Sequence, residues 1–323
     1  MKKVFIFSLL FFIISTFSFA DLWDDPAFKL YKKAVYFFNQ KQYIKAESLL
    51  KRSLKIFPDN FLTLFLMGDT LFVQKRYKEA KLFYQKTLKI YPSFLEGYER
   101  MAAVEEALGN YYDAKKYYLN IIKRKPNNKE AIKGIIRIGL YQKDLDNTLN
   151  IITPLVKNRK DKDILLLYSR LFKNKGKLLA EADVLKRIDN KDNQIKKELG
   201  FIYFKLKRWD ESEKWFNTLL NKDEEVLFAL GIIYYNKKAK DKALLFFKKA
   251  SSKMKNPARA FYNIAMILIE KEKYKKAREW LLKSVDADPN FKEAYLELGH
   301  LEEDIFLNIK KAKFYYSKAN KIK

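Results

Sequence analysis

The side chains that usually catalyse reactions or ligate metals are scarce in this sequence. His300 is the only histidine and there is no cysteine, so a metal site or an acid–base pair would depend almost entirely on carboxylates. The densest acidic runs are Glu105-Glu106 and Glu302-Glu303-Asp304. Consecutive residues of a helix point in different directions, so neither run presents two carboxylates to one substrate. His300 lies near Glu297 and Glu303, which is typical of a surface ion pair.

The sequence also lacks the patterns of phosphate and nucleic-acid binding. Gly134 and Gly139 stand apart from other glycines, whereas a phosphate loop needs clustered ones. The formal charge of +27 comes from 55 Lys and 11 Arg. Nucleic-acid readers favour Arg for its planar fork, and a Lys excess along a whole chain is typical of a soluble surface. We therefore predict a protein that is not an enzyme, needs no cofactor or metal and binds no nucleic acid.

The first twenty residues have the pattern of a targeting segment. Lys2 and Lys3 precede an apolar stretch over residues 4–19, and Ser18-Phe19-Ala20 has small residues where signal peptidase requires them. We predict a signal peptide over residues 1–20 and a short acidic lead over 21–26. The alternative is an uncleaved anchor helix, since sixteen residues are at the short limit of a membrane span. Both predict an exported chain, periplasmic or in the cell envelope.

Small residues recur through the remaining chain with a period close to 34. They are Ala46, Ala80, Ala114, Thr148, Ala182, Ser212, Ala243, Ala277 and Ala312. A large side chain usually stands three residues before each and another four residues after it, which lays one stripe along a helix. A second small set lies twelve residues upstream, so each unit is predicted to be two helices packed at their small residues. Pro58, Pro92, Pro126 and Pro289 fall twelve residues after a central small residue, where a proline ends the second helix.

At these residues the chain resembles the tetratricopeptide repeat family. The resemblance runs from Ala27 to Lys323 and implies an all-α fold, an α-solenoid of about nine helical hairpins wound as a right-handed superhelix. We predict one continuous solenoid over 27–323, irregular around 147–193. There Ile136 and Arg170 occupy the small first-helix position, and Pro154 lies inside a second helix. The two short intervals of 30 and 31 residues predict shortened connections between hairpins.

The resemblance implies a concave binding face made by four positions of each first helix. Over nine repeats these positions carry eight acids and four bases, so the face is apolar and slightly acidic. Its predicted partner-binding residues are Phe28, Tyr31, Phe38, Phe65, Phe72, Phe201, Phe204, Phe228, Tyr235 and Tyr262. Aromatic anchors of this kind can hold an extended or helical segment of a partner. The alternative is that they pack against neighbouring hairpins as core.

The lysine excess falls on the second helices, which the resemblance places on the convex back. It comprises Lys45, Lys51, Arg52, Lys55, Lys78, Lys81, Lys86, Lys89, Lys275, Lys276, Lys283, Lys310, Lys311, Lys313 and Lys318. This surface is either simply solvated or adheres weakly to an anionic membrane.

These patterns together predict a non-enzymatic protein-interaction scaffold in the bacterial cell envelope, with an apolar, aromatic-lined concave groove for a protein or peptide partner. The alternative is an accessory subunit of an envelope enzyme or of a transport or assembly machine, with weak membrane adhesion through the convex face.

Overall fold

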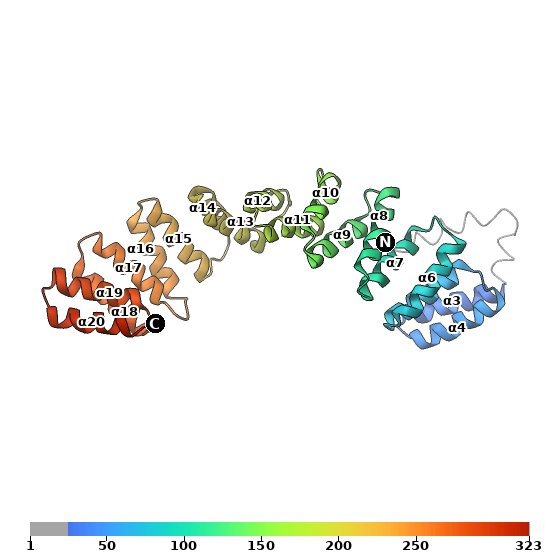
Figure 1. The fold of residues 1–323 in the computed structure, drawn as a ribbon, viewed down its shortest axis with the longest axis horizontal. Coiled ribbons are helices and arrows are strands. Elements are labelled where there is room, and N and C mark those ends of the chain that lie inside the picture. Colours follow the sequence, from blue (N-terminus) through green and yellow to red (C-terminus); the bar gives the residue numbers. More distant parts are fainter. Residues whose placement is uncertain (1–24, 323) are drawn as a thin grey trace. The chain divides into compact units, whose positions relative to one another are not determined.

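Residues 25–322 are described by a computed structural model. The predicted signal peptide and most of the acidic lead lie outside these residues. The described part of the chain contains helices and no strand, which confirms the all-α prediction (Figure 1). The helices are α3 (Pro26–Asn39), α4 (Tyr43–Ile56), α5 (Phe61–Val73), α6 (Tyr77–Ile90), α7 (Leu95–Ala107), α8 (Tyr111–Arg124), α9 (Lys129–Gln142), α10 (Leu145–Val156), α11 (Lys162–Asn174), α12 (Leu178–Lys186), α13 (Asn193–Lys205), α14 (Trp209–Asn217), α15 (Glu224–Asn236), α16 (Lys240–Ser251), α17 (Ala258–Ile269), α18 (Tyr274–Ala287), α19 (Lys292–His300) with the π-helical turn η1 (Leu301–Ile305), and α20 (Ile309–Lys321).

The chain divides into two compact units, Met1–Lys175 and Gly176–Lys323. Among the described residues, α3–α11 belong to the first unit and α12–α20 to the second. The boundary lies within residues 147–193, where the sequence loses its regular pattern, and it separates the fifth pair of helices, α11 and α12. Continuity of the solenoid over residues 27–323 stays a prediction.

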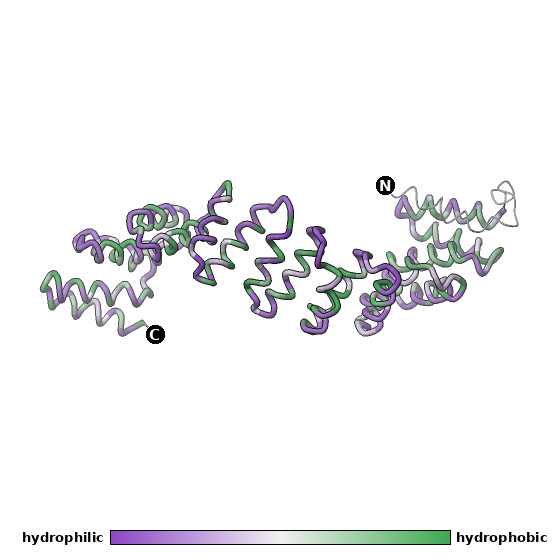
Figure 2. The backbone as a smooth tube through the Cα atoms, turned by 90° about the horizontal axis from the view of Figure 1, so that it is seen from above, coloured by the Kyte–Doolittle hydropathy of each residue, from purple (hydrophilic) through white to green (hydrophobic). Residues whose placement is uncertain are grey.

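Within each unit, consecutive helices pair as hairpins and each hairpin packs on the next. The helices are amphipathic, and Figure 2 shows hydrophobic and hydrophilic stretches alternating along them. The second helices α4, α6, α8 and α18 end two residues before a proline, as predicted. A proline cannot continue the helix, and the residue before it adopts extended backbone, as Phe57 does.

Each turn between the two helices of a pair contains one residue with positive φ. These residues are Lys41, Lys75, Gly109, Lys143, Gly176, Lys207, Lys238, Glu272 and Leu307. The residue after it often donates its N–H to a carbonyl five residues back, as Arg76 does to Leu71 at 3.0 Å, a bond that satisfies carbonyls at the helix end. Only two of the nine residues are glycine, so the turns are not marked by glycine in the sequence.

Small residues allow the two helices of a hairpin to approach closely. Ala80 is fully buried, and Gly68 on the facing helix lies under the ring of Tyr84. A Cβ placed on Gly68 would be 2.5 Å from that ring, closer than side-chain carbons approach. The same ring-on-glycine contact occurs in three other hairpins, as Gly200 with Phe216, Gly231 with Phe247 and Gly299 with Tyr316.

The two irregular repeats have no small residue at the predicted first-helix position, as the sequence indicates. In α9 the close contacts are made by Gly134, under Tyr118 of the preceding hairpin, and by Gly139, against Thr148. Ile136 is simply buried. In α11 the buried small residue is Ser169, while Arg170 is exposed. In both helices a small residue is therefore buried at a position other than the expected one.

The short sequence intervals also have a different cause from the predicted one. Helices α12 and α14 have only 9 residues, against 14 in α4. The connections that follow them, residues 187–192 and 218–223, are longer than residues 57–60 after α4. Each second helix has lost a turn, and its connection is not shortened.

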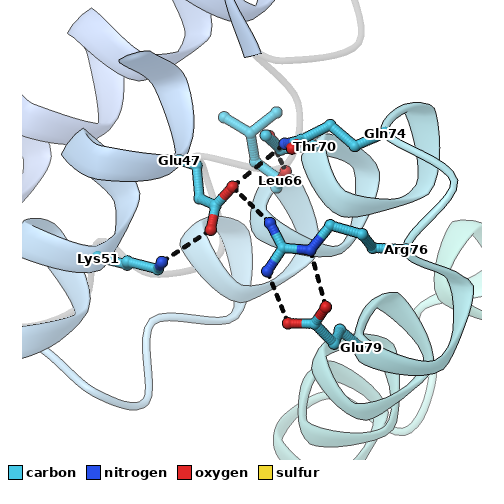
Figure 3. A network of polar contacts seen from close by, with 7 residues as sticks. All are labelled: Glu47, Lys51, Leu66, Thr70, Gln74, Arg76 and Glu79. Atoms are coloured by element: carbon cyan, nitrogen blue, oxygen red, sulfur yellow. Dashed lines mark hydrogen bonds and ion pairs between the residues drawn. The ribbon is translucent and has the colours of Figure 1, made fainter. Parts of the chain in front are cut away.

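Ion pairs join several second helices to the turn of the following hairpin. Figure 3 shows the first of these junctions, where Glu47 of α4 accepts hydrogen bonds from Arg76 Nη1 at 2.8 Å and Gln74 Nε2 at 3.2 Å and pairs with Lys51 at 2.7 Å. Arg76 is also held by both carboxylate oxygens of Glu79. Equivalent junctions are Lys115–Asp144, Lys175–Asp146, Lys237–Glu213 and Lys271–Asp241.

The Glu47 junction should make the first unit sensitive to acid. Burial alone would raise the pKa of Glu47, but the hydrogen bonds from Lys51, Arg76 and Gln74 outweigh it and lower the pKa below its ordinary 4.5. A lowered pKa contributes stability above pH 4.5 that is lost as the pH falls through the folded value. Glu47→Gln should therefore destabilise the protein by about 1–3 kcal/mol at neutral pH and by much less in acid.

The measurement is urea unfolding followed by circular dichroism at neutral pH and below pH 4.5. Glu96→Gln, at a carboxylate with no ion pair among the described residues, is the control and should change stability little at either pH. An equal loss for Glu47→Gln at both pH values would contradict the role of the ionised junction.

Candidate interaction surface

The ten predicted binding residues divide equally between the units. Five lie on α3 and α5 of the first unit, and five on α13, α15 and α17 of the second. Nine of them are partly buried, and Tyr235 is 38% exposed. None is a fully buried core residue, so each ring both packs against its own unit and retains exposed surface.

Three of these rings close the turn end of a hairpin. Phe38, Phe72 and Phe204 each pack on the first residue of the second helix, Tyr43, Tyr77 or Trp209. The ring centroids are 5.5, 5.3 and 5.6 Å apart. For these three residues the main contact is therefore packing inside the protein, which is the alternative to partner binding.

Other rings lie over the middle of the hairpin. Phe65 contacts Tyr84 at 5.7 Å and Phe94 of the next connection at 4.9 Å between ring centroids. The corresponding second-unit contacts are Phe201 with Phe216 at 5.0 Å, Phe228 with Phe247 at 5.3 Å and Tyr262 with Phe291 at 5.2 Å. Phe65 is therefore an anchored ring whose position is fixed before any partner binds, which lowers the entropy lost on binding.

Phe28 and Tyr31 form a stacked pair on α3, with centroids 6.1 Å apart. Burial and the charge of Asp69 raise the pKa of Tyr31 to about 12, so its hydroxyl stays protonated at physiological pH. Tyr235, in the second unit, donates its hydroxyl to the Glu270 carboxylate.

A polar cluster on the first helices of the first unit was not predicted. Asp69 of α5 accepts a hydrogen bond from the Tyr84 hydroxyl at 2.6 Å and from Arg100 Nε of α7 at 2.7 Å. Burial and the charge of Asp69 raise the pKa of Tyr84, so Tyr84 remains a donor. The Arg100 guanidinium also lies over the ring of Phe65, 5.9 Å from its centroid.

The cluster repeats one hairpin later. Glu106 of α7 accepts hydrogen bonds from the Tyr118 hydroxyl at 2.8 Å and from Arg137 Nη2 of α9 at 3.0 Å. In both clusters the acid and the arginine are 31 residues apart. In the second unit the tyrosine–acid contact recurs, as Tyr316 with Glu303 at 2.7 Å.

The two arginines leave donors available for a ligand. Their side chains are 46% and 44% exposed, whereas Asp69 and Glu106 are 15% and 21% exposed. Arg100 uses only its Nε, and Arg137 only Nη2, for hydrogen bonds to the described residues. Each half-buried acid thus fixes a guanidinium whose remaining N–H groups can bind a carboxylate.

The predicted basic surface consists largely of lysines without ion pairs. Lys51 pairs with Glu47 and Lys81 with Glu105, both at 2.7 Å; within residues 25–322 the other basic residues of that set make no ion pair. His300 is exposed, with its Nδ1 3.7 Å from Glu297. In the described part of the chain no three His, Asp or Glu residues are grouped as a metal site would need.

Comparison with known proteins identifies the hairpins. Residues 62–93, which cover α5 and α6, and residues 258–291, which cover α17 and α18, match family models of the tetratricopeptide repeat. No curated protein matches the sequence. Among the helices described, none is long and apolar enough to cross a membrane.

Several solved structures are similar in fold. A tetratricopeptide repeat protein from Parabacteroides merdae is 18% identical, with 75% of this chain and 98% of that one covered and a TM-score of 0.47. MamA from Desulfovibrio magneticus is 19% identical, covers 50% of this chain and 93% of its own, and has a TM-score of 0.45. The first repeat domain of Spaghetti, bound to an HSP90 peptide, is 24% identical over 36% of this chain and 93% of that one, with a TM-score of 0.35.

The helical hairpins, their close small-residue contacts and their junctions define a repeat protein of the α-hairpin class. With one family match in each unit and the same positions repeated in the other hairpins, the chain contains tetratricopeptide repeats in both units. Proteins of this kind are generally scaffolds for protein interaction.

Proposed function

We propose that this protein is a non-enzymatic scaffold of the cell envelope that holds a segment of a partner protein on the first helices of its first unit. The observation that carries the proposal is the repeated tyrosine–acid–arginine cluster beside the anchored ring of Phe65. We call Phe65, Arg100 and Arg137, with Asp69 and Glu106, the first-unit binding face.

The chemistry of this face favours an apolar segment that also carries carboxylates. Fixed aromatic rings supply contact area at a low cost in entropy, and arginines are the charged residues most often found at the centre of interfaces. A partner carboxylate would accept hydrogen bonds from the remaining N–H groups of Arg100 or Arg137, whose guanidinium groups are already oriented by an acid. The second unit has similar rings, but Arg208 and Arg278, which pair there with Glu211 and Glu302, lie in the turn before α14 and on α18 and not on a first helix.

The envelope location in this proposal is supported by the sequence of residues 1–20. Mass spectrometry of the mature protein tests it, because removal of this segment leaves a chain that begins at Asp21. A mature chain that retains Met1 would support an anchor.

The proposed binding face is tested by site-specific photo-crosslinking in cells. A photoreactive phenylalanine at position 65 should crosslink to the partner, whereas the same group at the exposed second-helix position 82 should not. The two positions belong to the same hairpin, so expression and folding can be compared directly.

A further inference from the structure

The last three second helices of the second unit concentrate positive charge. Helices α16, α18 and α20 contain thirteen Lys or Arg residues and three acids, a net charge of +10. The paired segments α15, α17, α19 and η1 contain two bases and seven acids, a net charge of −5. The other two second helices of the same unit, α12 and α14, carry a combined net charge of −3. Among the second helices of this unit, the positive charge is therefore concentrated on α16, α18 and α20.

Most of these charges have no counter-ion in the protein. Lys240 pairs with Glu270 and Arg278 with Glu302; the other eleven bases make no ion pair with any residue in the range 25–322. All eleven are exposed. A surface that leaves its lysines unpaired is suited to an anionic partner.

Exposed apolar side chains lie among the lysines. Leu245 on α16, Leu282 on α18 and Phe314 on α20 are 49%, 40% and 55% exposed. Trp280 is partly buried, with Lys248 of α16 and Lys283 of α18 at 6.0 and 4.4 Å from its ring centroid. Lys318 lies 5.7 Å from the centroid of Phe314. The ring of Trp280 is thus flanked by lysines of two neighbouring second helices.

We infer that this surface, the outer face of α16, α18 and α20, binds the headgroup region of an anionic lipid bilayer. Lysines attract anionic headgroups, while Leu, Phe and Trp side chains enter the boundary between headgroups and acyl chains. Lysine stems can lie along the apolar surface with the ammonium group in water. A soluble polyanion would use the lysines but would gain little from the exposed leucines and Phe314, so their presence favours the bilayer.

The test is sedimentation of the full chain with vesicles of phosphatidylcholine alone or of phosphatidylcholine and phosphatidylglycerol in equal parts. The first twenty residues, with Lys2 and Lys3, are present in every variant, so differences between the variants report on this surface. Three variants are compared with the parent: Lys249→Glu with Lys283→Glu and Lys318→Glu; Leu245→Ser with Leu282→Ser and Phe314→Ser; and the control Lys177→Glu with Lys205→Glu and Lys214→Glu. The control residues are exposed lysines of the same unit outside this surface.

The parent should bind anionic vesicles in preference to neutral ones. The lysine variant should lose at least about tenfold in partitioning, since each lysine near the surface contributes to the attraction, and the control triple far less. The serine variant should also bind vesicles more weakly but should keep its retention on dextran sulfate. Equal binding of the parent to both vesicle types, or equal effects of the two lysine triples, would overturn the inference. So would unchanged vesicle binding by the serine variant, which would indicate a surface for soluble polyanions. Circular dichroism confirms that each variant stays helical.

Discussion

Replacing Phe247 by alanine should be among the most destabilising single substitutions in this protein, at about 3–5 kcal/mol. Its ring is buried between α15 and α16, where it packs on Gly231 and lies 5.3 Å from the ring of Phe228. The loss combines the lost burial of the ring with the cavity it leaves.

Gly231→Ala provides the sharper test, because its effect should depend on Phe247. A Cβ on Gly231 would lie 2.6 Å from the Phe247 ring, so the substitution alone should cost about 1–3 kcal/mol. In the Phe247→Ala background the ring is gone and the methyl group has room. There the higher helix propensity of alanine should make the same change neutral or stabilising, by up to about 1 kcal/mol.

The measurement is urea unfolding of the four proteins of this cycle, followed by tryptophan fluorescence. Three of the four tryptophans, Trp209, Trp215 and Trp280, lie in the second unit with the mutated hairpin. Equal costs of Gly231→Ala in both backgrounds would show that the ring-on-glycine contact does not hold the two helices together.

The second large effect concerns partner affinity. Arg100→Gln combined with Arg137→Gln should weaken binding of the proposed partner segment by about tenfold to a thousandfold, since a charge-assisted bond contributes roughly 1.5–3 kcal/mol. Glutamine keeps much of the length and removes the charge, so Asp69 and Glu106 still accept hydrogen bonds from Tyr84 and Tyr118.

The matched control is Arg52→Gln with Lys89→Gln, at exposed bases of second helices in the same unit. Affinity is measured with the partner segment identified by crosslinking, at low and at high salt. If the control pair lowered affinity as much as the arginine pair, general positive charge would explain the binding, and the role of the clusters would be refuted.

The repeated hairpins could be predicted because their packing uses residue size. Small residues such as Ala80 and Ala277 are required wherever two helices nearly touch. A proline such as Pro58 or Pro92 ends a helix in any context. Both kinds of residue therefore recur in the sequence with the period of the repeat. The turn residues with positive φ do not form a recognisable pattern in the sequence. Lys75 adopts positive φ because the hydrogen bonds of the turn hold it there, and lysine is common throughout this chain.

The binding face could be predicted only in part. Phe65 is among the predicted residues because the resemblance assigns its helix position to the concave face. Arg100 was missed because its position is not one of those four, although its long side chain reaches Asp69 on the neighbouring helix. The 31-residue spacing between acid and arginine was present in the sequence, but spacing alone does not show which acids and bases meet.

We propose that the first-unit binding face, and not the back of the same hairpin, holds the partner. Photo-crosslinking from positions 65 and 82 in cells tests it most directly, with each product identified by mass spectrometry. We expect one dominant crosslinked partner from position 65, which is lost when Arg100 and Arg137 are both changed to glutamine, and no such product from position 82. A partner that crosslinks from position 82 and not from position 65 would contradict it.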